Sequence, residues 1–305
     1  MRRRSLLGLG GALAIEWLAP RAHAKPLQSD ELDVVELDVV ELDVPGQRAF
    51  GRALLFLPRP LPSSPKLLVL LHGLGETHDQ QVGSRAFAER YGLLSAVSRL
   101  SHPPLGRTHE AQDYFGAGRL QELNLRLSRR PYQSPVLLCP FTPNPYKTGG
   151  EAVLGRYADF LTGRLKNEVE QRIGSDFPVS RCMVSGVSLG GYLAIEVFLR
   201  KPELFCALGT AQGAFGQGQA ARYAAGIASA SQRLGPRRVE ILTSSFDPYR
   251  RPNELLHQHL QKRKVASRLR VSPGPHDQRW LKESGTIEML LSADDVFAGL
   301  GSEVK

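Results

Sequence analysis

The chain has 305 residues, enough for one large domain with a sizeable core or for two small domains. Hydrophobic residues make up 42% and charged residues 23% of it, which excludes a long coiled coil, a collagen-like fibre and wholesale disorder. The net charge is +9, but most arginines are scattered and no dense Lys/Arg block with interleaved aromatic residues occurs. We therefore expect a solvated basic surface and no nucleic-acid partner.

The first 24 residues predict an export signal. Residues 2–4 are all arginine, residues 6–19 form an apolar stretch, and residues 22–24 read A-H-A, an A-x-A cleavage pattern. The paired arginines resemble a twin-arginine signal, so the expected partner is the twin-arginine or general export machinery, and the expected location is periplasmic or secreted in a bacterium. An uncleaved membrane anchor is the alternative, but the stretch is shorter than the roughly 20 residues that span a bilayer, and it contains Glu16.

Residues 25–45 are predicted to form an acidic linker. Within them, residues 31–44 read ELDVVELDVVELDV, a five-residue unit whose period matches neither a strand nor a helix. A solenoid needs longer and more numerous units. We expect a linker that drifts at most into an edge strand, followed by a globular domain over residues 46–305.

In that domain, short apolar runs alternate with segments of helical spacing. The expected strands are Ala53–Leu57, Leu67–Leu71, Val136–Cys139, Arg181–Ser185, Ala207–Ala211, Val239–Ser244 and Ser267–Ser272. The expected helices are Ser84–Leu100, Glu151–Ile173, Gly190–Arg200, Gln219–Leu234, Asn253–Arg263 and Thr286–Ala298. Residues 101–135, rich in Pro, Gly and Arg, predict a long surface insertion beside the site. The alternation predicts an α/β fold, with a mostly parallel central sheet and helices on both faces.

The three cysteines are predicted to be free, buried thiols. Cys139, Cys182 and Cys206 form no C-x-x-C pair, so neither a zinc site nor a redox motif is indicated. A Cys182–Cys206 disulfide is the alternative, because the strands that flank these residues can be neighbours. No metal and no cofactor is expected.

The sharpest motif is Gly186-Val187-Ser188-Leu189-Gly190, which matches G-x-S-x-G. In this nucleophile elbow a strand turns abruptly into a helix with the serine at the tip. Gly186 and Gly190 remove side chains where strand and helix crowd together, and the Leu189 N–H points at the same spot as the Ser188 hydroxyl. An apolar strand before the motif and the helix-forming run YLAIEVFL after it favour an elbow over an ordinary Gly/Ser turn.

A second loop is predicted to complete an oxyanion hole. Residues 71–75 read LHGLG directly after the strand KLLVL, and glycines let the backbone approach a ligand closely. We assign the Leu74 N–H as the second donor and interpret His72 as a structural, hydrogen-bonded histidine. A plain strand-to-helix turn is the alternative.

The general base and its orienting acid are expected on loops after two late strands. His276 lies in PGPHD after the strand SRLRVS, and Asp247 lies in SFDP just past the strand VEILTSS. Asp247 is expected to orient the imidazole, with an Asp-Pro turn as the alternative reading. Asp277 is adjacent to His276, but neighbouring side chains on a loop usually diverge, so Asp247 is preferred.

With these segments identified, the chain resembles the α/β-hydrolase superfamily over roughly residues 50–300, and within it the esterase-D and polyhydroxybutyrate-depolymerase type of esterase. The resemblance is carried by LLHGLGE ending at position 76, GVSLGGYLA at 186–194, KPELF at 201–205, FDPYR at 246–250 and PGPHD at 273–277. It implies hydrolysis of a carboxylic ester through an acyl-enzyme, with Ser188, Asp247 and His276 as the triad in the superfamily's chain order. Many relatives have an aromatic residue directly after the His-Asp pair, whereas this chain has Gln278.

The expected activity is therefore that of a serine esterase acting on a small-molecule or polymeric ester. Acyl transfer to an acceptor other than water uses the same triad and is an alternative. A non-catalytic ligand-binding member of the fold is a further alternative, although all three triad candidates are present. A peptidase of this fold is disfavoured, because no accessory domain is visible in the sequence.

Overall fold

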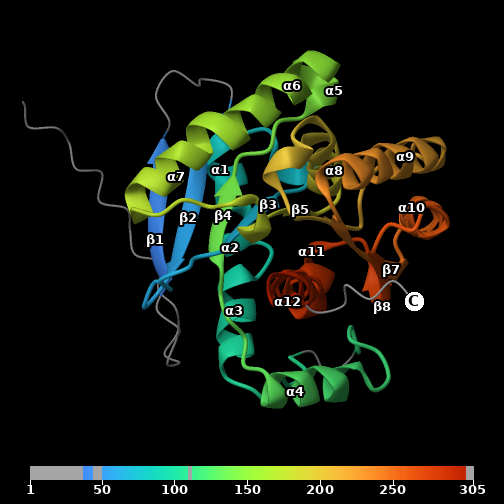
Figure 1. Ribbon diagram of the computed structural model, residues 1–305. Coiled ribbons are helices and arrows are strands. Elements are labelled where there is room, and N and C mark those ends of the chain that lie inside the picture. The colour runs from blue at the N-terminus through green and yellow to red at the C-terminus, as the bar shows by residue number, and fades with distance from the viewer. Residues whose placement is uncertain (1–36, 44–49, 109–111, 300–305) are drawn as a thin grey trace, which may run out of the picture. The chain divides into compact units, whose positions relative to one another are not determined.

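The central strands have apolar side chains on both faces, because helices cover both faces of the sheet. The computed structural model describes residues 37–43, 50–108 and 112–299 (Figure 1). The predicted signal peptide and most of the predicted acidic linker lie outside these residues.

The strands of the described residues form one eight-stranded sheet in the order β1-β2-β4-β3-β5-β6-β7-β8. Their bounds are β1 Leu37–Asp43, β2 Arg52–Pro58, β3 Leu67–Leu71, β4 Val136–Pro140, β5 Cys182–Gly186, β6 Ala207–Ala211, β7 Arg238–Phe246 and β8 Ser267–Pro275. Strand β2 runs antiparallel to both β1 and β4, and all other neighbours are parallel. The predicted mostly parallel sheet is confirmed.

The α-helices of the described residues lie between these strands. Their bounds are α1 Gln80–Ser84, α2 Ala86–Glu89, α3 Leu93–Ser101, α4 Arg119–Arg129, α5 Pro145–Thr148, α6 Gly150–Phe160, α7 Lys166–Ile173, α8 Leu189–Arg200, α9 Gln217–Leu234, α10 Arg250–Lys262, α11 Gln278–Trp280 and α12 Thr286–Phe297. Short 3-10 turns cover Leu74–Glu76, Val179–Arg181 and Pro202–Leu204, and π-helical turns cover Leu161–Leu165 and Leu281–Gly285.

Two expected helices differ from the structure. The predicted helix Ser84–Leu100 is divided into the end of α1, then α2 and α3. The break between α2 and α3 lies at Gly92, which adopts a left-handed conformation at φ 73°. The predicted helix Glu151–Ile173 contains a π-helical turn between α6 and α7. Hydrophobic spacing found the helical regions but not these local breaks.

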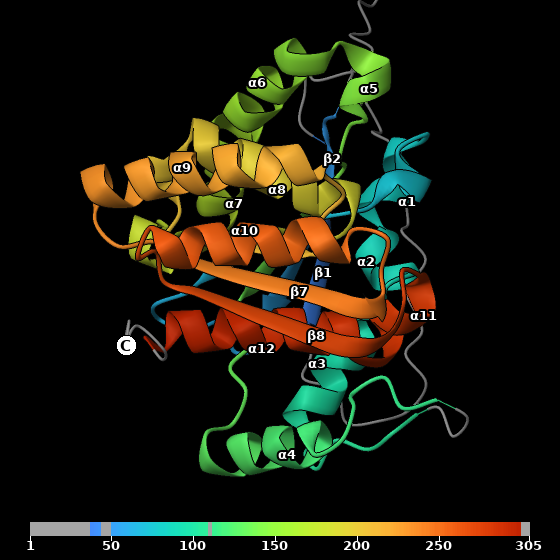
Figure 2. The same cartoon turned by 90° about the vertical axis from the view of Figure 1, so that its right-hand side faces the viewer.

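Alternate strand residues enter two separate cores. On β3, Leu67, Val69 and Leu71 face one core, while Leu68 and Leu70 face the other. The first core is covered by α6 to α10 and the second by α2, α3, α4 and α12. Figure 2 shows α10 and α12 on opposite faces of β7 and β8. This layering brings the carboxyl ends of the parallel strands, and the loops after them, to one edge of the sheet.

Part of the acidic repeat belongs to the sheet. Strand β1 pairs with β2 along its whole length, from Leu37 opposite Pro58 to Asp43 opposite Arg52. Backbone pairing with an existing strand, rather than the five-residue period, accounts for this edge strand. The remainder of residues 25–45 lies outside the described residues.

The insertion at 101–135 has one part beside the predicted site and one part away from it. Tyr114 packs against Gly274, two residues before His276, so that a Cβ on this glycine would lie 3.0 Å from the tyrosine ring. Helix α4 instead packs beside α12, where Arg119 forms a double hydrogen bond with the buried Glu288. Charge pairing with α12, together with the burial of Leu123 and Leu127 in the second core, positions this helix.

All three cysteines are free. The Cys206 thiol donates a hydrogen bond to the Cys182 carbonyl at 3.2 Å, and burial raises the pKa of both thiols. The alternative of a Cys182–Cys206 disulfide is therefore not what the structure contains.

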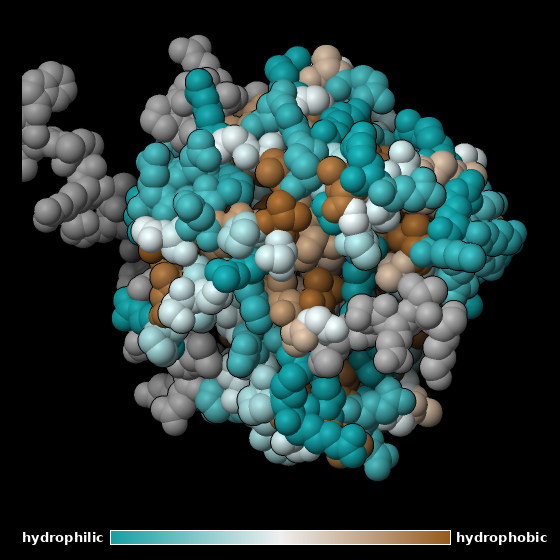
Figure 3. Space-filling model, in the orientation of Figure 1, coloured by the Kyte–Doolittle hydropathy of each residue, from teal (hydrophilic) through white to brown (hydrophobic). Residues whose placement is uncertain are grey.

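The surface is mainly hydrophilic on the face drawn in Figure 3, with hydrophobic residues visible between polar ones near its middle. Large hydrophobic residues that are exposed in the described ranges include Leu74, Tyr146 and Phe246. None of the helices in these ranges has the length and apolar character that crossing a bilayer requires.

Candidate active site

Ser188 lies at the sharp turn between β5 and α8. Its backbone has φ 56° and ψ −119°, a conformation that side-chain-bearing residues rarely adopt and that costs about 1–3 kcal/mol. The Ser188 N–H donates to the carbonyl of Ala211 at 2.9 Å, and the Val187 N–H donates to that of Leu71 at 3.0 Å. Hydrogen bonds to both neighbouring strands thus hold the turn in its strained conformation.

Gly186 and Gly190 permit this turn. A Cβ on Gly190 would lie 2.1 Å from the carbonyl oxygen of Leu71, and one on Gly186 would lie 2.3 Å from that of Gly190. Backbone atoms cannot move aside as a flexible side chain can. Strand and helix approach each other so closely here that both positions require glycine, which is the reason inferred from the sequence.

The structure brings Ser188, His276 and Asp247 together. The Nε2 atom of His276 lies 3.0 Å from the Ser188 hydroxyl oxygen, and its Nδ1 atom lies 2.8 Å from Asp247 Oδ1. Asp247 follows β7 and His276 follows β8, and these strands are parallel neighbours. Loops after adjacent strand ends therefore place the two side chains in contact.

Both oxygens of the Asp247 carboxylate accept hydrogen bonds. The Thr243 hydroxyl donates to Oδ2 at 2.6 Å, and the Tyr249 backbone N–H donates to Oδ1 at 2.9 Å. Its side chain is 0% exposed, whereas that of His276 is 23% exposed. The acid is thus fixed inside the protein, while the imidazole can be reached from solvent.

Asp277 has a different role in the structure. It is the N-cap of α11, where its carboxylate accepts the backbone N–H of Trp280 at 2.8 Å. The two adjacent side chains of His276 and Asp277 diverge, as the sequence interpretation assumed.

A hydrogen-bonded brace fixes the segment before His276. The side-chain amide of Gln212 donates to the Ser244 hydroxyl at 2.7 Å and to the Pro275 carbonyl at 3.0 Å, and the Ser244 hydroxyl also donates to that carbonyl. Gln212 has φ 49° directly after β6. Sequence reasoning missed this residue, since only the packing of three strand ends brings it to the site.

The loop predicted to provide an oxyanion donor lies against the nucleophile. A Cβ on Gly73 would be 3.6 Å from that of Ser188. The next residue, Leu74, is 54% exposed. Neither the Leu74 amide nor the Leu189 amide has an acceptor among the described residues. Both N–H groups are therefore available to a ligand.

Tyr91 and Glu76 hold this loop in place. The Tyr91 hydroxyl accepts the Gly73 N–H at 3.1 Å and donates to the buried Glu76 carboxylate. Burial, together with this carboxylate, raises the pKa of Tyr91. Tyr91 lies in the connection between α2 and α3, and no local sequence signal indicates that it contacts this loop.

His72 is a structural histidine, as interpreted from the sequence. It is buried, with Nδ1 2.9 Å from the Gly73 carbonyl oxygen and Nε2 accepting the Thr142 N–H at 2.8 Å. Burial lowers its pKa to about 4. The ring is thus neutral with its proton on Nδ1, and it links the loop after β3 to the loop after β4.

Aromatic side chains lie on α8 and beside His276. The rings of Tyr146 and Tyr192 stack with centroids 6.1 Å apart, and the Tyr249 ring contacts His276 edge to face at 5.6 Å. Tyr192 lies one helical turn after Ser188, and its N–H donates to the Ser188 carbonyl. A cavity of about 290 Å³ adjoins the stacked pair and is lined by residues 145–147, 149–151, 154 and 192.

Within the described residues, no cluster of His, Cys, Asp and Glu is arranged to hold a metal ion.

No protein-family model and no curated protein sequence matches the chain. Solved structures do match it. A ferulic acid esterase is 15% identical with a TM-score of 0.60, over 86% of this chain and 98% of that one. A feruloyl esterase module from Clostridium thermocellum, complexed with sinapinate, is 13% identical with a TM-score of 0.56, over 89% and 90%. The fluorophosphonate-binding serine hydrolase F of Staphylococcus aureus is 14% identical with a TM-score of 0.54, over 85% and 98%.

At these identities the likeness establishes the fold. It agrees with the sheet order, with the antiparallel β2 and with the sharp turn between β5 and α8. The chain therefore has the α/β-hydrolase fold.

Proposed function

We propose that this chain is a serine hydrolase that cleaves a carboxylic ester through an acyl-enzyme intermediate. One observation carries the proposal: a continuous hydrogen-bonded chain runs from the Ser188 hydroxyl through His276 to the buried carboxylate of Asp247. A serine hydroxyl is a weak nucleophile until an adjacent base accepts its proton. Here the base lies at hydrogen-bonding distance and is itself oriented by a third group.

In the proposed reaction, Ser188 Oγ attacks the acyl carbonyl while His276 Nε2 accepts its proton. The imidazolium returns this proton to the leaving alcohol as the carbon–oxygen bond of the ester breaks. His276 then deprotonates a water molecule that attacks the acyl-enzyme. The imidazolium returns this proton to Ser188 Oγ as the acyl–oxygen bond breaks, which releases the acid and the free serine. Asp247 keeps the His276 Nδ1–H in place and stabilises the imidazolium that forms twice in each cycle.

The Leu74 and Leu189 N–H groups are the proposed oxyanion hole. Charge develops on the carbonyl oxygen in the tetrahedral intermediate, and fixed donors stabilise it without reorganisation. Support comes from the free amide of Leu189 at the start of α8 and from the position of the Gly73–Leu74 loop against Ser188. The helix N-terminus adds its positive partial charge to the same point.

The proposed substrate carries an aromatic ring on one side of the ester. Tyr146 is 74% exposed and stacks on Tyr192 beside a cavity of about 290 Å³, so a planar ring can extend the stack. Stacked pairs contribute about 0.5–1.5 kcal/mol beyond area burial. A feruloyl ester is a reasonable member of a test panel, since structures of this fold include feruloyl esterases.

The test is a panel of aliphatic p-nitrophenyl esters and hydroxycinnamoyl esters, assayed with wild type and Ser188→Ala. Hydrolysis should disappear in the variant, and a fluorophosphonate probe should label Ser188 alone. Labelling that persists in Ser188→Ala refutes the assignment. Adding an alcohol acceptor separates hydrolysis from acyl transfer, because a transferase yields a new ester rather than the free acid. If the folded protein turns over no ester or thioester, this result supports the non-catalytic alternative.

Tyr146→Ala tests the aromatic subsite. It should lower kcat/KM for the aromatic substrates by about two- to tenfold, the worth of one stacking contact, and leave short aliphatic esters nearly unchanged. An equal loss for both classes contradicts the aromatic subsite without affecting the proposed chemistry.

We further propose that the enzyme is exported. The arginine run, apolar stretch and A-H-A pattern of residues 1–24 support this proposal. The proposed product of export is a mature chain acting in the periplasm or outside the cell.

A further inference from the structure

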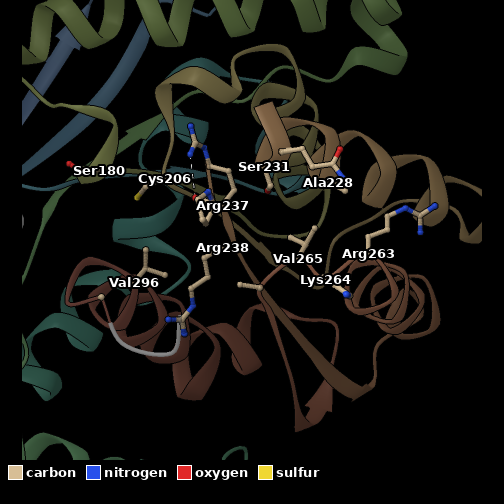
Figure 4. A pocket seen from close by; sticks show the side chains of 14 residues that line it. Ser180, Cys206, Ala228, Ser231, Arg237, Arg238, Arg263, Lys264, Val265 and Val296 are labelled. Carbon is tan, nitrogen blue, oxygen red and sulfur yellow. Dashed lines mark hydrogen bonds between the residues drawn. The ribbon is translucent and has the colours of Figure 1, made fainter. Parts of the chain in front are cut away.

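A second, larger cavity lies at the opposite edge of the sheet from Ser188. Its volume is about 590 Å³, within the range of small-molecule sites. It is lined by Ser180, Cys206, Ala228, Ser231, Gln232, Pro236, Arg237, Arg238, Arg263, Lys264, Val265, Ala266, Val296 and Gly299. These residues lie before or at the start of β5 to β8, in the last turns of α9 and α12, or directly after α10 and α12 (Figure 4).

The cavity is separated from the reacting atoms by the length of the strands. Arg238 begins β7, and Asp247 directly follows its last residue. Ala266 precedes β8, whose end leads to His276. Nine residues of strand span about 30 Å. A ligand in this cavity cannot contact the proposed triad, so the cavity is not part of the ester-binding site.

The charge around this cavity is of one sign. Four of its fourteen lining residues are basic and none is acidic. Arg238 is paired with the buried Glu240, and Arg237 donates to main-chain carbonyls at the end of α9. Among the described residues, neither Arg263 nor Lys264 forms an ion pair with an acid; Arg263 donates only to a main-chain carbonyl. The cavity therefore offers cationic groups whose charge no described carboxylate balances.

The remainder of the lining is largely apolar. Ala228, Pro236, Val265, Ala266 and Val296 contribute aliphatic surface. An apolar ligand body that covers this surface is removed from water, which is favourable.

We propose that this cavity binds a monocarboxylate with an apolar body, such as a medium-chain fatty acid or an aromatic acid. The carboxylate would lie near Lys264 and Arg263, and the apolar body would cover the valine and alanine side chains. An inorganic anion would use the charge but not the apolar surface. A neutral alcohol of equal length would use the surface but not the charge.

The test is isothermal titration calorimetry of the full chain with octanoate, octanol and inorganic phosphate. Octanoate should bind more tightly than both others, and its affinity should fall as ionic strength rises. Lys264→Gln should weaken octanoate binding by about two- to fivefold, the worth of one solvent-exposed ion pair. Lys262→Gln is the matched control, because Lys262 is the exposed last residue of α10 and does not line the cavity.

Ala228→Phe provides a second variant that fills the cavity from α9. It should abolish octanoate binding while circular dichroism shows a folded protein. If octanoate bound at the ester site instead, neither Lys264→Gln nor Ala228→Phe would change its affinity. An unchanged affinity in both variants would therefore overturn the proposal. Equal losses in Lys264→Gln and Lys262→Gln would also overturn it, since they would indicate diffuse charge attraction. Should Ala228→Phe fail to fold, the comparison of the two lysine variants still decides the question.

Discussion

Replacing Asp247 by Asn tests the proposed triad most directly, because the shape is kept and the charge is lost. Oδ1 accepts two N–H groups, from His276 and Tyr249, whereas Oδ2 accepts only the Thr243 hydroxyl. A hydroxyl can rotate to accept, but a backbone N–H cannot. The asparagine NH₂ should therefore take the Oδ2 position, leaving its carbonyl oxygen to accept the imidazole N–H.

The magnitude follows from this orientation. A hydrogen bond to a charged partner contributes about 1.5–3 kcal/mol and a neutral one about 0.5–1.5 kcal/mol. Losing the charge thus costs about 1–2 kcal/mol of imidazolium stabilisation, or roughly five- to thirtyfold in kcat. If the NH₂ instead faces the imidazole, the wrong tautomer is fixed and the loss approaches ten-thousandfold. We expect Asp247→Asn to lower kcat by an amount between these limits.

Asp277→Asn is the matched control. Asn is about as good an N-cap as Asp, so its carbonyl oxygen should still accept the Trp280 N–H. We expect kcat within about twofold of wild type and an almost unchanged melting temperature. The assay is kcat and KM on a p-nitrophenyl ester at neutral pH, after circular dichroism and thermal melts show both variants folded. If folded Asp277→Asn is the more damaged of the two, the role proposed for Asp247 is wrong.

Three further outcomes are expected. Gly190→Ala should abolish activity and lower the melting temperature sharply, because its Cβ would lie 2.1 Å from the Leu71 carbonyl oxygen. Gly155→Ala is the control: this residue lies in open space on α6, so the substitution should stabilise the fold by about 0.5–1 kcal/mol. Equal effects of the two substitutions in thermal melts would contradict the argument from crowding. Because burial lowers the pKa of His72 from 6.5 to about 4, the unfolded chain binds a proton that the folded chain does not between these values. The free energy of unfolding in urea should therefore fall by up to ~3 kcal/mol as the pH drops from 6.5 to 4, and a pH dependence unchanged in His72→Gln would refute this cause. Intact-mass analysis of exported protein should give a chain that begins at Lys25, whereas membrane-bound protein retaining residues 1–24 would support the anchor.

The sheet could be predicted well from the sequence because its central strands are short, continuous apolar runs. Such runs are typical of strands that are buried on both faces. Helix α4 was not predicted, although Leu123 and Leu127 have helical spacing, because the prediction treated residues 101–135 as a single irregular insertion. Arg126 and Arg130 both pair with Asp294 and Asp295 on α12. Local spacing can indicate this helix, but it contains no information about the distant acids that fix where the helix packs.

The same distinction applies to the candidate site. Ser188, Asp247 and His276 each follow a recognisable strand, so chain order and strand ends were enough to select them. Gln212, Thr243 and Tyr91 position these side chains and their loops through hydrogen bonds between segments distant in sequence or across strand ends. Their residue types occur throughout the chain, and only the packed structure distinguishes them.

The strained backbone of Ser188 has a consequence for how this protein can be improved. Glycine adopts φ 56° far more readily, so Ser188→Gly would relieve strain of about 1–3 kcal/mol and raise the melting temperature while removing the hydroxyl. Stability and turnover thus oppose each other at a single position. A directed-evolution screen that rewards heat resistance alone would select against the nucleophile, and each round of such a screen therefore needs an activity threshold to retain it.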